Sequence, residues 1–103
     1  MGELRNHARG EVVLEIDGAQ RRLCVTLGAL AELEAAFDVH ALTELGDRLK
    51  HMTASDLIIV LSALTAGAGA GMSTAELACA RIDPVAAARA VGAAFGAAFG
   101  DEP

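Results

Sequence analysis

The sequence predicts an α+β fold in which an N-terminal β-hairpin packs on a small bundle of four or five short helices. Hydrophobic and polar residues alternate over residues 11–26, which is the period of two expected of half-buried strands. Beyond Thr26 the hydrophobic spacing becomes helical, and capping residues and glycines divide it into short segments. The chain has 103 residues, a length typical of one small domain, so we expect residues 1–103 to form a single domain.

The predicted hairpin turns at Asp17-Gly18. Glycine accepts a positive φ and aspartate tolerates one, so this dipeptide is a strong signal for a tight turn between two strands. On the buried face we expect three residues from each side of the turn: Val12, Leu14 and Ile16, and Leu23, Val25 and Leu27. On the solvated face we expect acidic residues opposite basic ones: Glu11 and Glu15, and Arg21 and Arg22.

Helix start signals mark the segments that follow the hairpin. Thr26 is a predicted N-cap, Thr53 with Asp56 and Ser73 with Glu76 resemble capping boxes, and Asp83-Pro84 supplies an N-cap followed by a proline. Leu27, Leu30, Leu33 and Phe37 are spaced to form one apolar stripe, and so are Leu42, Leu45 and Leu49. The predicted helices are residues 27–37, 41–51, 54–66, 74–81 and 84–99.

Two of these helices stand out by composition. The helix over residues 54–66 is apolar on most sides, which predicts the central, most buried position, and the glycine-rich residues 67–71 after it predict a flexible joint. The last helix contains many of the 23 alanines of the chain, which bury little area, so we expect a thin core. Its predicted stripe is Val85, Ala88, Gly92, Phe95 and Phe99, with Phe95 and Phe99 either in the core or at a partner-binding surface.

Composition and spacing argue against several classes of function. Eight basic residues against fourteen acidic ones give a net charge of −6, which repels a nucleic acid backbone, and the chain has three Phe and no Trp or Tyr for base stacking. The glycine-rich segment lacks the lysine of a phosphate loop, and the histidines, serines and cysteines form no recognisable catalytic or metal-binding signature. We therefore expect no enzyme activity, no cofactor and no metal, with Cys24 and Cys79 as reduced, buried thiols.

The sequence also bears on location. Residues 1–10 lack the apolar run of a secretory signal, and glycines and Glu76 interrupt the low-charge stretch over residues 57–77. We expect a cytoplasmic protein with no membrane span. The alanine- and glycine-lined residues 85–99 would pack equally well within a monomer or across a dimer, so a homo-oligomer stays open.

Two motifs near the amino end resemble those of a known family. The first is Asn6-x-x-Arg9-Gly10-Glu11, and the second is Thr-Leu-Gly-Ala-Leu-Ala-Glu-Leu-Glu over residues 26–34. Together they resemble the small gene-transfer-agent family proteins, which are similar to tail assembly chaperones of long-tailed phages. The resemblance covers roughly residues 6 to 37, about a third of the chain.

This resemblance implies a role in assembly inside a bacterial host cell. It favours a tail assembly chaperone of a gene transfer agent or prophage, which would bind the tape-measure protein, and possibly the tail tube protein, and keep the tape measure soluble. The alternative is a structural tail component that stays in the particle. The expected partner-binding residues are Asn6, Arg9 and Glu11 at the hairpin entry, and Phe95 and Phe99 in the last helix.

Overall fold

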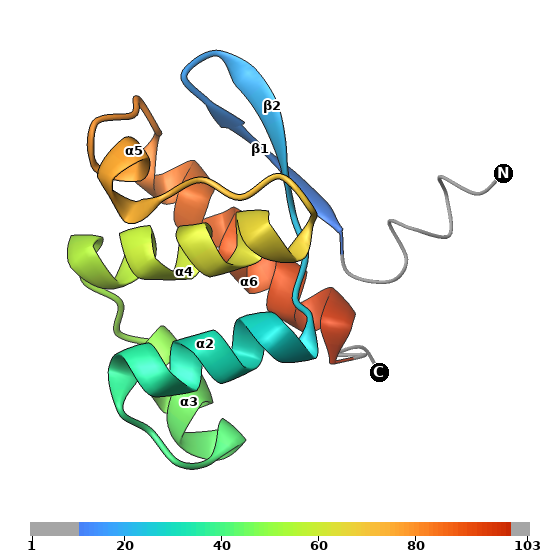
Figure 1. Cartoon of the computed structure of the whole chain (residues 1–103), viewed down its shortest axis with the longest axis vertical. Helices are drawn as coiled ribbons and strands as arrows, with labels where there is room; N and C mark the ends of the chain where they lie inside the picture. Colours follow the sequence, from blue (N-terminus) through green and yellow to red (C-terminus); the bar gives the residue numbers. More distant parts are fainter. Residues whose placement is uncertain (1–10, 100–103) are drawn as a thin grey trace, which may run out of the picture.

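The computed structural model describes residues 11–99 and has the predicted α+β fold, a two-stranded antiparallel hairpin followed by five helices (Figure 1). The strands are β1 (Val12–Ile16) and β2 (Ala19–Leu23), and the helices are α2 (Leu27–Phe37), α3 (Leu42–Leu49), α4 (Ala54–Gly67), α5 (Thr74–Ala78) and α6 (Pro84–Ala98). Most helix limits lie within one or two residues of those expected, and α5 is three residues shorter than predicted at its C-terminal end.

The hairpin has the turn that Asp17-Gly18 predicts. Both residues have positive φ, 55° and 79°, and the register pairs Ile16 with Ala19 across the two-residue turn. A turn with two positive φ angles matches the right-handed twist of the strands that it joins. The expected opposition of charges on the solvated face is present between Glu11 and Arg22, whose charged groups are 3.8 Å apart.

The buried face of the hairpin is shorter than expected. Leu14, Ile16 and Leu23 are almost completely buried. Leu27, predicted to be buried both in the hairpin and in the first helical stripe, is 84% exposed. Because β2 ends at Leu23 and Leu27 is already the first residue of α2, its side chain follows the helix and points away from the core.

Helix α4 is the central element, as its composition predicts. It contacts α2, β2, α5 and α6, and Figure 1 shows it across the middle of the molecule. Its capping box is complete, since Thr53 Oγ1 accepts from the Asp56 N–H and Asp56 accepts from the Thr53 N–H. Val60, Leu61 and Leu64 are buried, so this helix supplies much of the core.

Gly67, at the end of α4, has a packing role that its place in a glycine-rich run does not predict. The Cys24 N–H donates to the Leu64 carbonyl at 3.0 Å, which brings the chain leaving β2 against this end of α4. A Cβ atom built on Gly67 would clash with the Cys24 carbonyl oxygen. The far end of the glycine segment is also held, because the Met72 N–H donates to Thr65 Oγ1 at 3.0 Å.

Helix α5 ends earlier than predicted because the chain after it bonds to the hairpin. The Asp17 N–H donates to the Arg81 carbonyl at 3.0 Å, and the Arg81 N–H donates to Asp17 Oδ1 at 2.7 Å. Arg81 therefore bonds to the hairpin turn instead of continuing the helix, and α5 stops at Ala78. The capping box predicted at Ser73 and Glu76 is present at the start of this helix.

The buried face of α6 differs from the predicted stripe. Its buried residues are small apart from one valine: Ala87, Ala90, Val91 and Ala94. Val85 is 60% exposed and Phe99 is 57% exposed. The predicted stripe follows the larger side chains, whereas α6 packs through alanines that allow a close approach to β1 and α4.

Candidate partner-binding groove

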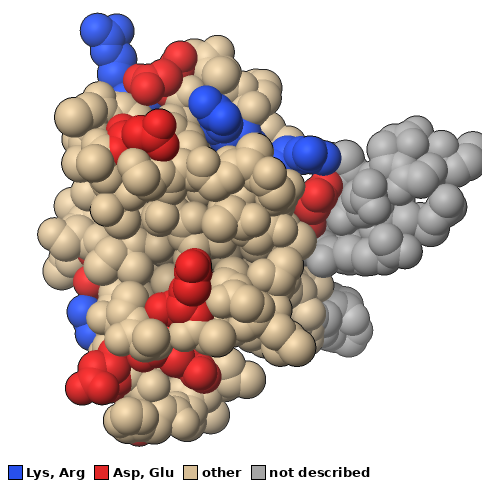
Figure 2. Space-filling view, viewed as in Figure 1, with Lys and Arg blue, Asp and Glu red and all other residues tan. Residues whose placement is uncertain are grey.

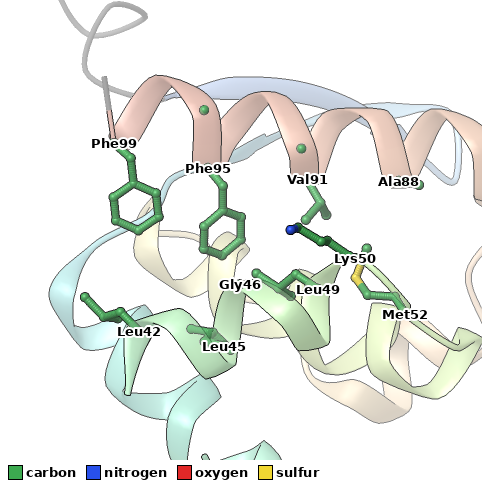
Figure 3. A pocket seen from close by; sticks show the side chains of 12 residues that line it. Leu42, Leu45, Gly46, Leu49, Lys50, Met52, Ala88, Val91, Phe95 and Phe99 are labelled. Carbon is green, nitrogen blue, oxygen red and sulfur yellow. The ribbon is translucent and has the colours of Figure 1, made fainter. Parts of the chain in front are cut away.

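An apolar groove lies between α3 and α6. Its volume is about 660 Å³, and Lys50 is the one charged residue among those that line it. The α3 side is formed by Leu42, Gly46 and Leu49, with Leu45 below them, and the α6 side includes Phe95 and Phe99 (Figure 3). The remaining lining residues are Met52, Ala88, Val91, Gly92 and Gly96.

Phe95 on α6 and Phe99, the C-cap residue of α6, lie at the groove rather than in the buried core. Their ring centroids are 5.9 Å apart, with the rings tilted by 33°. Phe95 is half-buried and packs against the core, while Phe99 is 57% exposed. Figure 3 shows both rings projecting from α6 toward α3. These side chains therefore have an apolar surface that a partner can reach.

Helix α3, which forms the other wall of the groove, is fixed to the rest of the molecule by a few specific contacts. Leu45 is buried, with 2% of its surface exposed. Arg48 makes a two-pronged ion pair with Asp56 at the start of α4, with Nη2–Oδ1 and Nε–Oδ2 distances of 3.0 and 3.2 Å. The Arg48 guanidinium also lies over the Phe37 ring, 4.5 Å from its centroid. These contacts fix α3 against α2 and α4, and the side facing α6 is open.

The ion pair is electrostatically coupled to the helix cap of α4. The hydrogen bonds from Arg48, followed by the hydrogen bond from the Thr53 backbone N–H, lower the pKa of the Asp56 carboxyl below its ordinary value. The same bond to Asp56 raises the pKa of Arg48. The pair is therefore ionised at neutral pH. From the sequence we predicted Asp56 only as part of the capping box, because its pairing with Arg48, eight residues earlier, depends on how α3 packs.

Of the other three predicted partner-binding residues, the structure describes Glu11. Asn6 and Arg9 fall outside the described residues. Glu11 is bound to Arg22 on the hairpin and is not among the residues that line the groove. Of the five predicted residues, the structure thus brings Phe95 and Phe99 together, and it shows that Leu42 and Leu49 on α3 share their surface. The sequence signal for the α3 side was its apolar stripe, from which we predicted a helix but no binding surface.

The cysteines differ from the expectation that both are buried. Cys24 is half-buried, whereas Cys79 is exposed. Burial raises the pKa of the Cys24 thiol, and the negative charge of Glu11 adds to this shift. Cys24 is therefore protonated and a poor nucleophile at neutral pH.

Within residues 11–99, no group of three or more His, Cys, Asp or Glu side chains is arranged to hold a metal ion. No helix within the same range has the length and apolar character needed to cross a bilayer.

The chain matches one known protein family over most of its length. A family model described as phage tail tube protein, GTA-gp10, matches residues 9–101. The match includes both walls of the groove and nearly the whole chain. The chain belongs to this family. Its role therefore concerns a phage-type tail.

The family match covers more of the chain than the resemblance at the amino end, and it does not support the chaperone role that the resemblance favours. The match continues through the helical second half, for which no motif had been recognised, while Asn6 lies just before the matched residues. The gene-transfer-agent and phage tail relationship is confirmed, but the family's description names a tail tube protein and not a chaperone. Neither the curated proteins nor the solved structures compared with this chain include a match.

Proposed function

We propose that the protein is a structural component of a phage-type tail and remains in the particle. The observation that carries this proposal is the match of residues 9–101 to the tail tube protein family. The groove between α3 and α6 supports it, because an accessible apolar surface is typical of a protein that works through contacts with other proteins. In this view the protein has no catalytic function, and it is made and assembled in the cytoplasm of a bacterial host.

Purified particles test this proposal. We expect quantitative mass spectrometry of particles released from the host to find the protein at a constant ratio to the other tail proteins. An abundant cytoplasmic protein of the host, measured in the same particle samples, is the control for contamination from the lysate. If the protein is abundant in the lysate and missing from purified particles, it is not a structural component.

A second candidate function is that of a tail assembly chaperone that binds the tape-measure protein and keeps it soluble. The half-exposed Phe99 and the open groove favour it, since covering the apolar stripes of a long helical chain requires such a surface. Co-expression with the tape-measure protein of the same gene cluster, followed by affinity capture and sizing, tests this function. A soluble complex in the lysate, together with absence from particles, would replace the structural proposal by the chaperone.

A further inference from the structure

We infer that the outer edge of β1, formed by the backbone groups of Val13 and Glu15, binds an extended segment of another protein. This segment would add a third strand to the hairpin and carry lysine or arginine opposite Glu15. The edge is separate from the groove between α3 and α6. The inference goes beyond the proposed function, since it holds whether or not the protein stays in the particle.

The register of the hairpin determines which backbone groups of β1 point outward. The turn contains two residues, so the flanking residues Ile16 and Ala19 form a hydrogen-bonded pair. Hydrogen-bonded and non-hydrogen-bonded pairs alternate along an antiparallel ladder. Val13 and Glu15 therefore occupy non-hydrogen-bonded positions, and their N–H and C=O groups point away from β2.

The two edges of the hairpin differ in their surroundings. The same alternation directs the Cys24 N–H outward from the end of β2, and this group donates to the Leu64 carbonyl of α4 at 3.0 Å. Within residues 11–99, β1 pairs with β2 alone, and no backbone group outside the hairpin bonds to Val13 or Glu15. Both of these residues are exposed, Val13 to 44%. In the described part of the chain, the edge of β1 is thus available to a new strand.

The chemistry of this edge fits an extended segment and not a helix. An antiparallel strand laid along it would exchange one pair of backbone hydrogen bonds with Val13 and another with Glu15. Such main-chain bonds provide the affinity of strand addition, and alternate side chains provide its specificity. A helix has its backbone groups paired internally, so it would leave those of Val13 and Glu15 without partners.

The charges on β1 favour a basic segment. Side chains alternate along a strand, so Glu11, Val13 and Glu15 share the solvated face. Glu11 lies 3.8 Å from Arg22, whereas no ion pair involves Glu15 within residues 11–99. Figure 2 shows charges of both signs at the upper end of the molecule, where Figure 1 places the hairpin. A lysine or arginine opposite Glu15 would form a favourable cross-strand pair.

The same charges disfavour a second copy of this chain as the added strand. In a symmetric dimer joined through both β1 edges, Glu11 and Glu15 of the two copies would lie on one face of the sheet. Like charges on neighbouring strands destabilise their pairing, and charged side chains on an edge strand commonly prevent self-association. The strand β2 of a second copy is also a poor partner, because α4 already bonds to its outer edge at Cys24.

A peptide titration on the isotopically labelled full chain, followed by NMR, tests the inference. The probe is the end-capped peptide Thr-Lys-Thr-Val-Thr-Lys, which in antiparallel register places lysines opposite Glu11 and Glu15 and valine opposite Val13. We expect the amide signals of β1 to shift. The same peptide with glutamate in place of lysine should bind at least about threefold more weakly.

A modified peptide backbone distinguishes strand addition from other contacts. N-methylation of the peptide's valine removes the N–H that would bond to the Val13 carbonyl, and should weaken binding by at least about tenfold. N-methylation of the threonine before it is the matched control, because that N–H points away from β1 in the added strand.

Variants of the chain locate the site. Glu15→Lys should abolish the preference for the lysine peptide over the glutamate peptide. Glu32→Lys is the matched control, since it makes the same charge change at an exposed position of α2. Val13→Pro removes an outward N–H and leaves the bonds between β1 and β2 intact, so it should lose peptide binding. Circular dichroism checks its fold, and Glu15→Lys tests the site without a change of backbone.

Several outcomes would overturn the inference. These are no shift at β1 with the lysine peptide, equal binding of the lysine and glutamate peptides, or equal binding of the two N-methylated peptides. A dimer of the chain alone that Val13→Pro abolishes would overturn it in favour of a second copy. Because binding is measured on the isolated chain, its result is distinct from the presence of the protein in purified particles.

Discussion

Helices α4 and α3 differ in how they pack against the rest of the molecule. Helix α4 is surrounded by α2, β2, α5 and α6, and Val60 and Leu64 in it are completely buried. Helix α3 has one buried residue, Leu45, together with the ion pair from Arg48 to α4. Stability is therefore concentrated around α4, while α3 leaves its apolar side available to a partner.

Truncating a leucine in each helix should show the largest difference. Leu64→Ala removes a fully buried side chain from α4 and is expected to cost about 2–5 kcal/mol of unfolding free energy. Leu42→Ala removes a half-exposed side chain from α3 and should cost less than about 1 kcal/mol. Urea denaturation followed by circular dichroism measures both values. Equal losses would mean that α3 belongs to the core as fully as α4.

A methyl group at the end of α4 should produce the next largest effect. Gly67→Ala forces the added Cβ against the Cys24 carbonyl, so the backbone must shift, at an expected cost of about 1–3 kcal/mol. Gly28→Ala is the control, because its Cβ would lie at an ordinary 3.8 Å from Thr26 Oγ1. The same denaturation curves compare the two variants. A Gly67→Ala protein as stable as the control would show that this close approach is not needed.

Acid should loosen α3 before it affects the core. Because the pKa of Asp56 is lowered in the folded protein, its contribution to stability is fully present above the unfolded value of about 3.9. That contribution is lost as pH falls through the lower folded value. Between pH 6 and pH 3, Asp56→Asn should therefore lose less stability than the unaltered protein. Asp47→Asn, at an exposed position of α3, is the control, and a matching loss in both variants would contradict this assignment.

The smallest expected effect is a gain. Gly46→Ala adds a methyl group inside α3, and Gly92→Ala adds one inside α6. At both positions the added methyl group has open space around it. Alanine reduces the conformational entropy of the unfolded chain, so each change should raise stability by about 0.4–1 kcal/mol. Thermal unfolding measures this gain. A loss at Gly46 would indicate that the groove closes in solution and leaves no room for the methyl group.

The parts of the fold that the sequence predicts are those set by local interactions. The Asp17-Gly18 turn and the capping boxes at Thr53 and Ser73 depend on residues within three positions of each other. Their geometry is therefore contained in short stretches of sequence, and the structure has all of them.

The parts that sequence did not predict depend on contacts between distant segments. The buried face of α6 consists largely of alanines, and alanines also lie on its other faces. Periodicity therefore cannot distinguish the buried face, and the predicted stripe followed the larger Phe95 and Phe99. The groove requires α3 and α6 to face each other across about 50 positions of sequence. Spacing within either helix cannot show which surface stays uncovered.

The bonds between Asp17 and Arg81 also affect how the protein is made. They join the tight turn between β1 and β2 to a residue 64 positions later. At 5–20 residues per second, a ribosome needs roughly 3–13 s to synthesise that interval. During this time Leu14 and Ile16 lack the α6 surface that covers β1 in the finished protein. The hairpin is thus synthesised well before the segments that secure it, and the nascent chain is more prone to aggregation until α6 emerges.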